Sequence, residues 1–397
     1  MRAKPLHGIR ILDLTRFLAG PYATMLLADL GAEVVKVEAP EGGDPARRNG
    51  PFVHGVSTYF LSVNRGKKSI TCNLKEARGR DLFLRLVDHA DAVVENYRPG
   101  VMRALGLDWP VLRERNARLI YAACSGFGQT GPLAQRAAYD LVVQAMGGTV
   151  SVTGTPGGEP VRVGYSIGDL AGGMFTAMGL LAALIERGNS GRGQFLDVSM
   201  MDCQVALLEN AVARYFATGE VAGPLGTKHP VVTPIQAYPT GDGYIVLAIG
   251  EERQWQRFCR VAGVAHLLTD PRFQEKNART AHREELDEIL RSLTAQRTTA
   301  EWTQLLEPTG IAYGEINRIN EVVAHPQIQA RGMIAEVPVG DGQETARLVA
   351  SPMKLSETPV GPDAGPPALG EHNRTYYQEL LGLSAEPCAE LRQAGII

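Results

Sequence analysis

The sequence predicts an α/β fold in which a doubly wound parallel sheet is accompanied by a second, smaller domain. Strand-like hydrophobic runs alternate with helical segments over residues 9–217, which is typical of β-α-β units and hence of a parallel sheet. Residues 223–230 are rich in Gly and Pro, as in a linker or loop, and residues 235–325 mix a strand with amphipathic helices. The length of 397 residues suggests two or three domains of roughly 150 residues each.

The elements of the first domain follow in order from local signals. Residues 9–14 read as a buried strand, and the segment from Pro21 to Gly31 predicts a helix, because Pro favours the first helical position and Gly the position after the end. Further strands are predicted at residues 34–38, 69–74, 92–95, 119–124 and 194–200, and further helices at 77–89, 101–105, 137–148, 169–187 and 201–217. Ligands of such sheets bind at the carboxyl ends of the strands, so functional residues are expected just after them.

The second domain and the tail complete the chain. A strand is predicted at residues 244–249, and amphipathic helices are predicted at 252–261, 283–293 and 299–306. From residue 356 the chain is rich in Pro and Gly, which predicts an extended strap along the surface.

Composition argues against several classes of function. The net charge is −3 without a long basic block, which disfavours nucleic acid or an acidic membrane surface as the main partner. The N-terminus lacks an apolar signal segment, and no uninterrupted apolar stretch reaches the roughly 20 residues of a membrane span. The five cysteines are scattered without a C-x-x-C, and the eight histidines form no H-x-x-x-H pair. We therefore expect a cytoplasmic protein without a disulfide framework, metal site or tightly bound cofactor.

Asp169 is the most informative residue, because it opens a helix made largely of Gly, Ala, Leu and Met. Small residues after it allow a large ligand to lie against the backbone. A poorly solvated carboxylate in that setting suits use as a nucleophile. The alternative is an ordinary helix cap, for which Asp is a preferred residue. The two interpretations are compatible, because a cap position also lies at the positive end of the helix dipole.

Two basic segments could hold phosphates at the carboxyl edge of the sheet. Residues 64–75 form the densest basic stretch, and residues 95–103 carry two arginines after a predicted strand, with Tyr97 available to stack on a base. An ordinary solvated surface is the alternative for each lysine taken alone.

Two further segments have less specific signals. Residues 126–131 read Gly-Phe-Gly-Gln-Thr-Gly, but Pro132 follows at once and no helix opens inside the motif, which favours a glycine-rich turn beside a pocket over a dinucleotide site. Tyr139 and Asp140 begin a helix and could supply a hydroxyl and a second charge near Asp169. A core tyrosine beside a helix-start aspartate is the alternative.

Taken together, these segments resemble the class III CoA-transferases, the family of formyl-CoA transferase and carnitine CoA-transferase. The matching segments cover nearly the whole chain and are residues 11–15, 19–21, 30–38, 64–70, 95–100, 126–132, 139–140, 168–169, 191–194 and 369–372. The resemblance implies a Rossmann-like large domain with an inserted smaller α+β domain, in a homodimer of interlocked ring-like subunits. The implied division is residues 1–222 for the N-terminal part of the large domain, 223–330 for the small domain with its linkers, and 331–397 for the return to the large domain.

The resemblance also assigns roles to residues. The family nucleophile falls on Asp169, and the substrates are coenzyme A thioesters and a small carboxylic acid. The CoA-binding positions that carry over are Leu18, Ala19, Cys72, Asn73, Lys75, Asn96, Tyr97, Arg98, Arg136, Tyr139 and Asp140. Arg103 can substitute for a family arginine that Ala104 replaces. Gly250 and Glu251 stand where formyl-CoA transferase has a glycine-rich lid, and this reduced lid disfavours formate and oxalate as substrates.

The resemblance is strongest to the succinate–hydroxymethylglutarate (glutarate) CoA-transferase branch, on residues 13–21, 59–65, 128–132 and 313–317. This branch implies succinyl-CoA as donor, a dicarboxylic acid as acceptor and an aspartyl-CoA thioester as intermediate. The second carboxylate of the acceptor needs a cationic partner. The candidates are Arg16, Arg47, Arg48, Lys228 and His229, among which Arg16 and the loop of Lys228 and His229 are favoured.

Two alternatives stay open at this level. Related α-methylacyl-CoA racemases place a catalytic His where this chain has Tyr139, so the missing His favours transfer over racemisation or epimerisation. A non-catalytic CoA-binding protein, with Asp169 as a mere helix cap, would bind CoA without forming a covalent aspartyl intermediate.

Overall fold

The computed structural model describes residues 2–340 and 342–397, and in them the predicted parallel sheet is confirmed. Its strands are β1 (Arg10–Asp13), β2 (Glu33–Glu38), β5 (Lys68–Thr71), β6 (Ala92–Glu95), β7 (Ile120–Ser125) and β8 (Phe195–Ser199). They lie in the order β5-β2-β1-β6-β7-β8, and every neighbouring pair is parallel. Counted along the chain within this sheet, the order is 3-2-1-4-5-6, that of the doubly wound nucleotide-binding folds. The order reverses between β1 and β6, where such folds bind their ligands.

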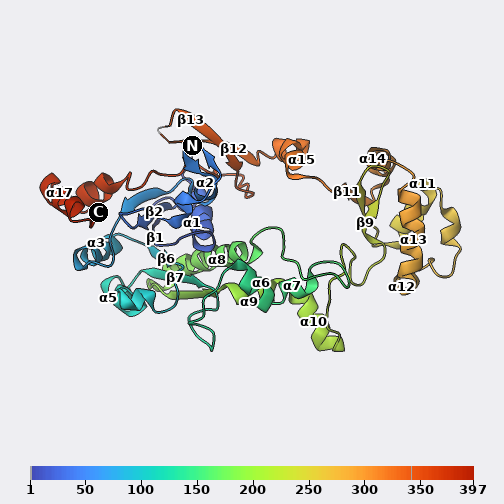
Figure 1. The fold of residues 1–397 in the computed structure, drawn as a ribbon, viewed down its shortest axis with the longest axis horizontal. Coiled ribbons are helices and arrows are strands. Elements are labelled where there is room, and N and C mark those ends of the chain that lie inside the picture. The colour runs from blue at the N-terminus through green and yellow to red at the C-terminus, as the bar shows by residue number, and fades with distance from the viewer. Residues whose placement is uncertain (1, 341) are drawn as a thin grey trace. The chain divides into compact units, whose positions relative to one another are not determined.

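Helices cover both faces of the sheet, which is why its strands are nearly continuous hydrophobic runs. Successive residues point to opposite faces, so that Ile11 packs with α1 (Ala19–Asp29) and α8 (Ile167–Ser190), whereas Leu12 packs with α3 (Ala77–Val87) and the C-terminal helices. Figure 1 shows α1 and α8 beside the sheet. By length and composition α8 could cross a membrane, but α1 and the sheet bury one of its faces, as in a core helix.

Contacts divide the chain into two compact units. The first contains residues up to 150, 162–220 and 326–397, and the second contains residues 151–161 and 221–325. Residues 151–161, which the sequence analysis places in the large domain, therefore group with the second unit. The interlocked homodimer stays a prediction.

The second unit is built on the antiparallel sheet β11-β10-β9, with strands β9 (Ile235–Pro239), β10 (Tyr244–Ala248) and β11 (Ala312–Glu315). Its helices are α11 (Glu252–Val261), η2 (Ala265–Leu268), α12 (Lys276–Ala281), α13 (Arg283–Thr294), α14 (Thr299–Leu306), η3 (Glu307–Thr309) and α15 (Ile319–Ala324). Trp255, Phe258 and Trp302 stack at its centre and are fully buried.

The C-terminal segment returns to the first sheet. After α16 (Pro326–Ala330) it forms the antiparallel hairpin β12 (Ile334–Val339) and β13 (Glu344–Val349), which the sequence analysis missed. An extended stretch follows, as predicted from residue 356, and leads into η4 (Arg374–Leu380) and α17 (Ala385–Gln393). Tyr377 Oη donates a hydrogen bond of 2.7 Å to Thr71 O at the end of β5.

The other elements lie between the strands of the first sheet or follow its last strand, β8. They are η1 (Pro45–Arg48), β3 (Phe52–Val53), β4 (Val56–Ser57), α2 (Thr58–Asn64), α4 (Val101–Ala104), α5 (Trp109–Arg115), α6 (Asp140–Met146), α7 (Thr149–Val152), α9 (Met200–Leu207) and α10 (Glu209–Thr218). The single helix predicted at residues 201–217 is wrong, because the chain breaks into two helices at Leu208.

Candidate active site

A cleft of about 260 Å³ lies at the point where the strand order reverses. Its walls come from segments that directly follow β1, β6 and β7, as the rule for doubly wound sheets predicts. The lining residues are Arg16, Phe17, Leu18, Ala19, Tyr59, Asn96, Tyr97, Arg98, Pro99, Cys124, Ser125, Gly126, Ala134, Arg136, Ala138, Tyr139, Asp169 and Met200. The structure thus brings Asp169 together with Arg16 and seven of the predicted CoA-binding residues.

Asp169 lies in the first turn of α8, but it is not the helix cap. The helix begins at Ile167 and its cap residue is Ser166, so the predicted cap position is wrong by three residues. The carboxylate nevertheless stays at the positive end of the helix dipole. Burial raises the pKa of Asp169 to about 7, and the nearby charge of Asp140 adds to this effect. At neutral pH the group is therefore divided between its acid and its carboxylate forms.

Asp140 caps α8 from the outside. Its Oδ1 accepts hydrogen bonds from the backbone N–H groups of Gly168 (2.8 Å) and Asp169 (3.4 Å), and its Oδ2 accepts one from Gln144 Nε2 (2.6 Å). The side chain is 9% exposed and is not part of the cleft wall among the described residues. Protein donors occupy both oxygens, so the predicted CoA contact of Asp140 does not match this geometry. It positions Asp169 instead.

A buried ion pair fixes the start of the loop after β1. Lys67 Nζ lies 2.9 Å from Asp13 Oδ2, and both side chains are fully buried. Although burial acts in the opposite direction, the charges of Lys67 and Lys36 hold the pKa of Asp13 at about 2. Lys36 Nζ donates a hydrogen bond of 2.7 Å to Thr15 O. The backbone at the base of the cleft is therefore held by charges in the core.

Two residues after Thr15, the backbone of this loop is strained. Phe17 has φ 64°, a left-handed conformation that residues other than Gly rarely adopt. Its N–H donates a hydrogen bond of 3.3 Å to Asp44 Oδ1, and Asp44 is itself paired with Lys36 at 2.8 Å. The conformation of the cleft wall at Phe17 is thus imposed by buried charges.

Three arginines supply positive charge to the cleft. Arg16, Arg98 and Arg136 are exposed, and none of them forms an ion pair with a described residue. Arg16 lies 4.8 Å from the ring centroid of Tyr97, and its backbone exchanges two hydrogen bonds of 2.8 Å with the side chain of Asn96. The cleft is therefore suited to an anionic ligand.

Three predicted CoA-binding residues lie outside this cleft, after the edge strand β5. Cys72 is 2% exposed, its Sγ donates a hydrogen bond of 3.2 Å to Gly79 O, and burial raises its pKa to about 12. Asn73 Oδ1 accepts a hydrogen bond of 3.2 Å from the backbone N–H of Lys75, whose side chain is exposed. The Cys72 side chain is therefore a core group rather than a ligand contact.

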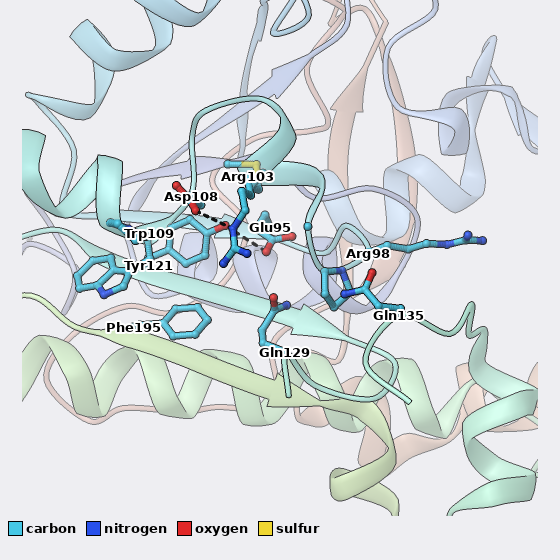
Figure 2. Close-up of a pocket in the computed structure, with 13 residues that line it drawn as sticks. Glu95, Arg98, Arg103, Asp108, Trp109, Tyr121, Gln129, Gln135 and Phe195 are labelled. Atoms are coloured by element: carbon cyan, nitrogen blue, oxygen red, sulfur yellow. Dashed lines mark hydrogen bonds and ion pairs between the residues drawn. The ribbon is translucent and has the colours of Figure 1, made fainter. Parts of the chain in front are cut away.

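Arg103 lines a neighbouring pocket of about 360 Å³, which shares Arg98 and Pro99 with the cleft. Arg103 Nε lies 3.3 Å from Asp108 Oδ2. Figure 2 shows this pair, with Glu95 and Tyr121 drawn beside it. Burial raises the pKa of Glu95 to about 7, and its carboxylate accepts a hydrogen bond of 2.7 Å from Tyr97 N. The sequence analysis did not foresee this pocket.

Three other predicted substrate contacts already have partners within the protein. Arg47 lies 2.6 Å from Glu38, and in the second unit Lys228 lies 2.8 Å from Asp287. His229 Nδ1 accepts hydrogen bonds from two backbone N–H groups of its own loop.

The predicted lid residues begin a helix of the second unit. The N–H groups of Gly250 and Glu251 both donate to Gln254 Oε1, at 3.0 and 3.1 Å, so this loop is held by a capping interaction. Its role as a lid stays a prediction.

Tyr59 and Ser125 are cleft residues to which the sequence analysis gave no role. Burial raises the pKa of Tyr59 to about 12, and the charge of Asp169 contributes. Ser125 ends β7, so the rule that ligands bind at strand ends could have singled it out.

Known proteins match the chain over nearly its whole length. The model of the CoA-transferase family III matches residues 6–373, as the sequence resemblance predicted. A succinate–glutarate CoA-transferase of Agrobacterium fabrum is 39% identical over 386 residues, which are 96% of each chain. An acetyl-CoA:oxalate CoA-transferase of Acetobacter aceti is 42% identical over 331 residues, 83% of this chain and 85% of that protein. The crystal structure of a CAIB/BAIF family protein from Brucella suis superposes with a TM-score of 0.85 at 37% identity, covering 96% of this chain and 100% of that one.

Proposed function

Because this chain belongs to CoA-transferase family III, and is therefore an enzyme that transfers coenzyme A, we propose that it moves CoA from succinyl-CoA to a dicarboxylic acid. The name of the Agrobacterium relative, a succinate–glutarate CoA-transferase, supports this choice because succinate and glutarate are both dicarboxylates. The position of Asp169, a carboxylate in an arginine-lined cleft where the strand order reverses, carries the proposal. We further propose that the enzyme works in the cytoplasm as an interlocked homodimer.

The proposed reaction passes CoA through Asp169. The ionised carboxylate attacks the thioester carbonyl, and the C–S bond breaks to give a mixed anhydride and CoA thiolate. The thiolate attacks the aspartyl carbonyl, which releases succinate and leaves an aspartyl-CoA thioester. The acceptor carboxylate then attacks this thioester, giving a second anhydride and CoA thiolate. Attack of the thiolate on the acceptor carbonyl forms the product thioester and restores Asp169.

Each step exchanges one activated acyl group for another, so the reaction needs no energy source beyond the donor thioester. The burial that raises the pKa of Asp169 also keeps water from the anhydride and thioester intermediates, which hydrolyse readily. The same burial therefore has two effects: it leaves the nucleophile partly protonated at neutral pH, and it excludes water from the reaction site.

Asp169→Ala tests the nucleophile. Wild-type enzyme should transfer CoA from succinyl-CoA to a panel of dicarboxylic acids, and hydroxylamine should trap the activated Asp169 as a hydroxamate detectable by mass spectrometry. Asp169→Ala should lose both signals, whereas Asp202→Ala, which removes an exposed carboxylate from the first turn of α9, should keep them. Undiminished transfer by Asp169→Ala would refute the mechanism. Exchange of the α-proton into deuterated water without an acceptor acid would instead indicate a racemase.

Arg16 is the proposed partner of the remote carboxylate of the acceptor. It lines the same cleft as Asp169 and has no described ion-pair partner, whereas Arg47 and Lys228 are paired. Arg16→Ala should lower kcat/KM for glutarate by at least about tenfold more than for butyrate, because a charge-assisted hydrogen bond contributes about 1.5–3 kcal/mol. Arg48→Ala, which removes an exposed arginine, is the control. Equal losses for both acids would show that Arg16 does not select the second carboxylate.

A further inference from the structure

Ser125 is a buried hydroxyl in the wall of the Asp169 cleft, and its Oγ has no hydrogen-bond partner. The side chain is 5% exposed and stands at the last position of β7, beside the point where the strand order of the sheet reverses. A buried polar group without a partner is costly, so native proteins retain few of them. An unpaired hydroxyl that faces a ligand cleft is explained if the ligand supplies its partner.

The neighbouring strand provides an internal comparison. Ser199 lies opposite Ser125 in the β7–β8 register and is equally buried, at 5% exposure. Its Oγ accepts a hydrogen bond of 3.1 Å from the N–H of Asp202 and so caps α9. Two serines of the same burial, in one register pair, therefore differ in two linked respects. Ser199 has a structural partner and does not line the cleft, whereas Ser125 lines the cleft and has none.

The surroundings place Ser125 near the reacting group. The next residue, Gly126, packs so closely on Ala138 that an added Cβ would lie 2.2 Å from the Ala138 Cβ. Ala138 is followed by Tyr139, in the cleft wall, and by Asp140, which holds the backbone of Asp169. The end of β7 is thus joined through one short segment to the turn that carries the proposed nucleophile.

We propose that the Ser125 hydroxyl donates a hydrogen bond to a carbonyl oxygen of the acyl-CoA that occupies this cleft. The inference rests on the proposed function, because it takes the Asp169 cleft as the place of the thioester. A CoA thioester offers two kinds of acceptor, the amide carbonyls of its flexible arm and the thioester carbonyl itself. A hydroxyl can donate to either, since both are neutral oxygens that lose water on entering a half-buried site.

Ser125→Ala separates a ligand-binding role from a structural one. Loss of a neutral hydrogen bond should lower kcat/KM for succinyl-CoA by about three- to tenfold. The melting temperature should stay unchanged or rise, because the variant removes an unpaired buried hydroxyl without breaking any bond of the free protein. Ser199→Ala is the matched control: it should lower the melting temperature by about 2 °C or more through loss of the α9 cap, while kcat/KM changes less than about twofold.

Calorimetric titration with free CoA distinguishes the two acceptors. Weaker binding of free CoA by Ser125→Ala would assign the hydrogen bond to the arm amides, and unchanged CoA binding with a loss confined to succinyl-CoA turnover would assign it to the thioester carbonyl.

Unchanged turnover and binding would overturn the inference, as would a loss of activity accompanied by a fall in melting temperature like that of Ser199→Ala. If Ser125→Ala does not fold, Ser125→Cys takes its place, because the thiol nearly keeps the volume of the side chain but is a weak hydrogen-bond donor. This variant must then show the lower kcat/KM for succinyl-CoA, and full activity in it would overturn the inference. Failure of the wild-type enzyme to transfer CoA would refute the proposed function instead.

Discussion

Replacing Asp140 with Asn is expected to make CoA transfer less sensitive to acid. The pKa of Asp169 is raised to about 7, first by burial and second by the charge of Asp140. Asn keeps an oxygen that can accept the hydrogen bonds from the Gly168 and Asp169 N–H groups, so the helix start should persist without the charge. The pKa of Asp169 should then fall, and the attacking carboxylate should stay ionised at lower pH.

The size of the effect follows from the ionisation equilibrium. With a pKa of about 7, roughly one tenth of Asp169 is ionised at pH 6. If the lost repulsion amounts to about 1.4 kcal/mol, the ionisation constant changes about tenfold and roughly half of the group is ionised at that pH. At pH 6, each enzyme's kcat/KM is divided by its own maximal value at high pH, where Asp169 is fully ionised. This ratio should be about fivefold higher for Asp140→Asn than for the wild type.

The assay is the pH profile of kcat/KM for succinyl-CoA between pH 5 and 9, which reports ionisations of the free enzyme. Asp202→Asn, a variant of an exposed carboxylate, should leave the profile in place. Asp140→Ala removes both the charge and the cap and should also lower the free energy of unfolding, by about 1 kcal/mol or more. An acidic limb of Asp140→Asn that coincides with the wild-type limb would refute the assignment of Asp140 as the charge that acts on Asp169.

Three further outcomes are expected. Asp169→Asn should raise the free energy of unfolding by up to about 4 kcal/mol at pH 8 and by much less at pH 4. The reason is that the folded pKa of Asp169 is raised from 3.8 to about 7, so the wild-type protein loses stability as the pH rises between these values. Equal gains at both pH values in urea unfolding would contradict this. Lys67→Met should lower the free energy of unfolding by about 3–5 kcal/mol, since it leaves Asp13 charged in the core, and circular dichroism during denaturation measures the loss. Gly193→Ala should lower the melting temperature, because its Cβ would lie 1.8 Å from Leu119 O, whereas Gly188→Ala in the open part of α8 should raise it slightly.

The parts of the fold that follow from local pattern could be predicted from sequence. The runs around Ile11 and Val93 are hydrophobic on both faces because helices cover both sides, and this pattern persists over whole strands. Element ends depend on one or two residues and are harder to predict. The break at Leu208 and the cap of α8 at Ser166, three residues before the predicted cap Asp169, are of this kind. The hairpin at residues 334–349 depends on pairing between strands, and its local signal is weak.

The candidate site also has parts that could be predicted from local sequence and parts that depend on tertiary contacts. The strand-end rule finds residues 16–19 and 96–99, because the carboxyl ends of parallel strands meet at one edge of the sheet. It cannot tell which charges are already paired. Arg47 and Arg16 look alike in sequence, but among the described residues only Arg47 is paired with a glutamate, Glu38 at the end of β2. Asp140 likewise changes from a presumed ligand contact to a positioning residue only when its distance to the N-terminus of α8 is known.

Three departures from ordinary folding rules coincide in the cleft. Asp169 is a carboxyl whose burial disfavours its charge, Ser125 is a buried hydroxyl without a partner, and Phe17 holds a left-handed backbone conformation. Each is unfavourable for stability, and each would be relieved by a common substitution such as Asn, Ala or Gly. All three residues line the same cleft. Folding alone is a poor explanation for this, because the folded state would be more stable if all three features were removed. The proposed binding of a thioester accounts for the first two: its carbonyl carbon would be the target of the Asp169 carboxylate, and its carbonyl oxygens would be acceptors for Ser125. Phe17 lines the same cleft, so its strained turn shapes the wall that the proposed ligand would meet.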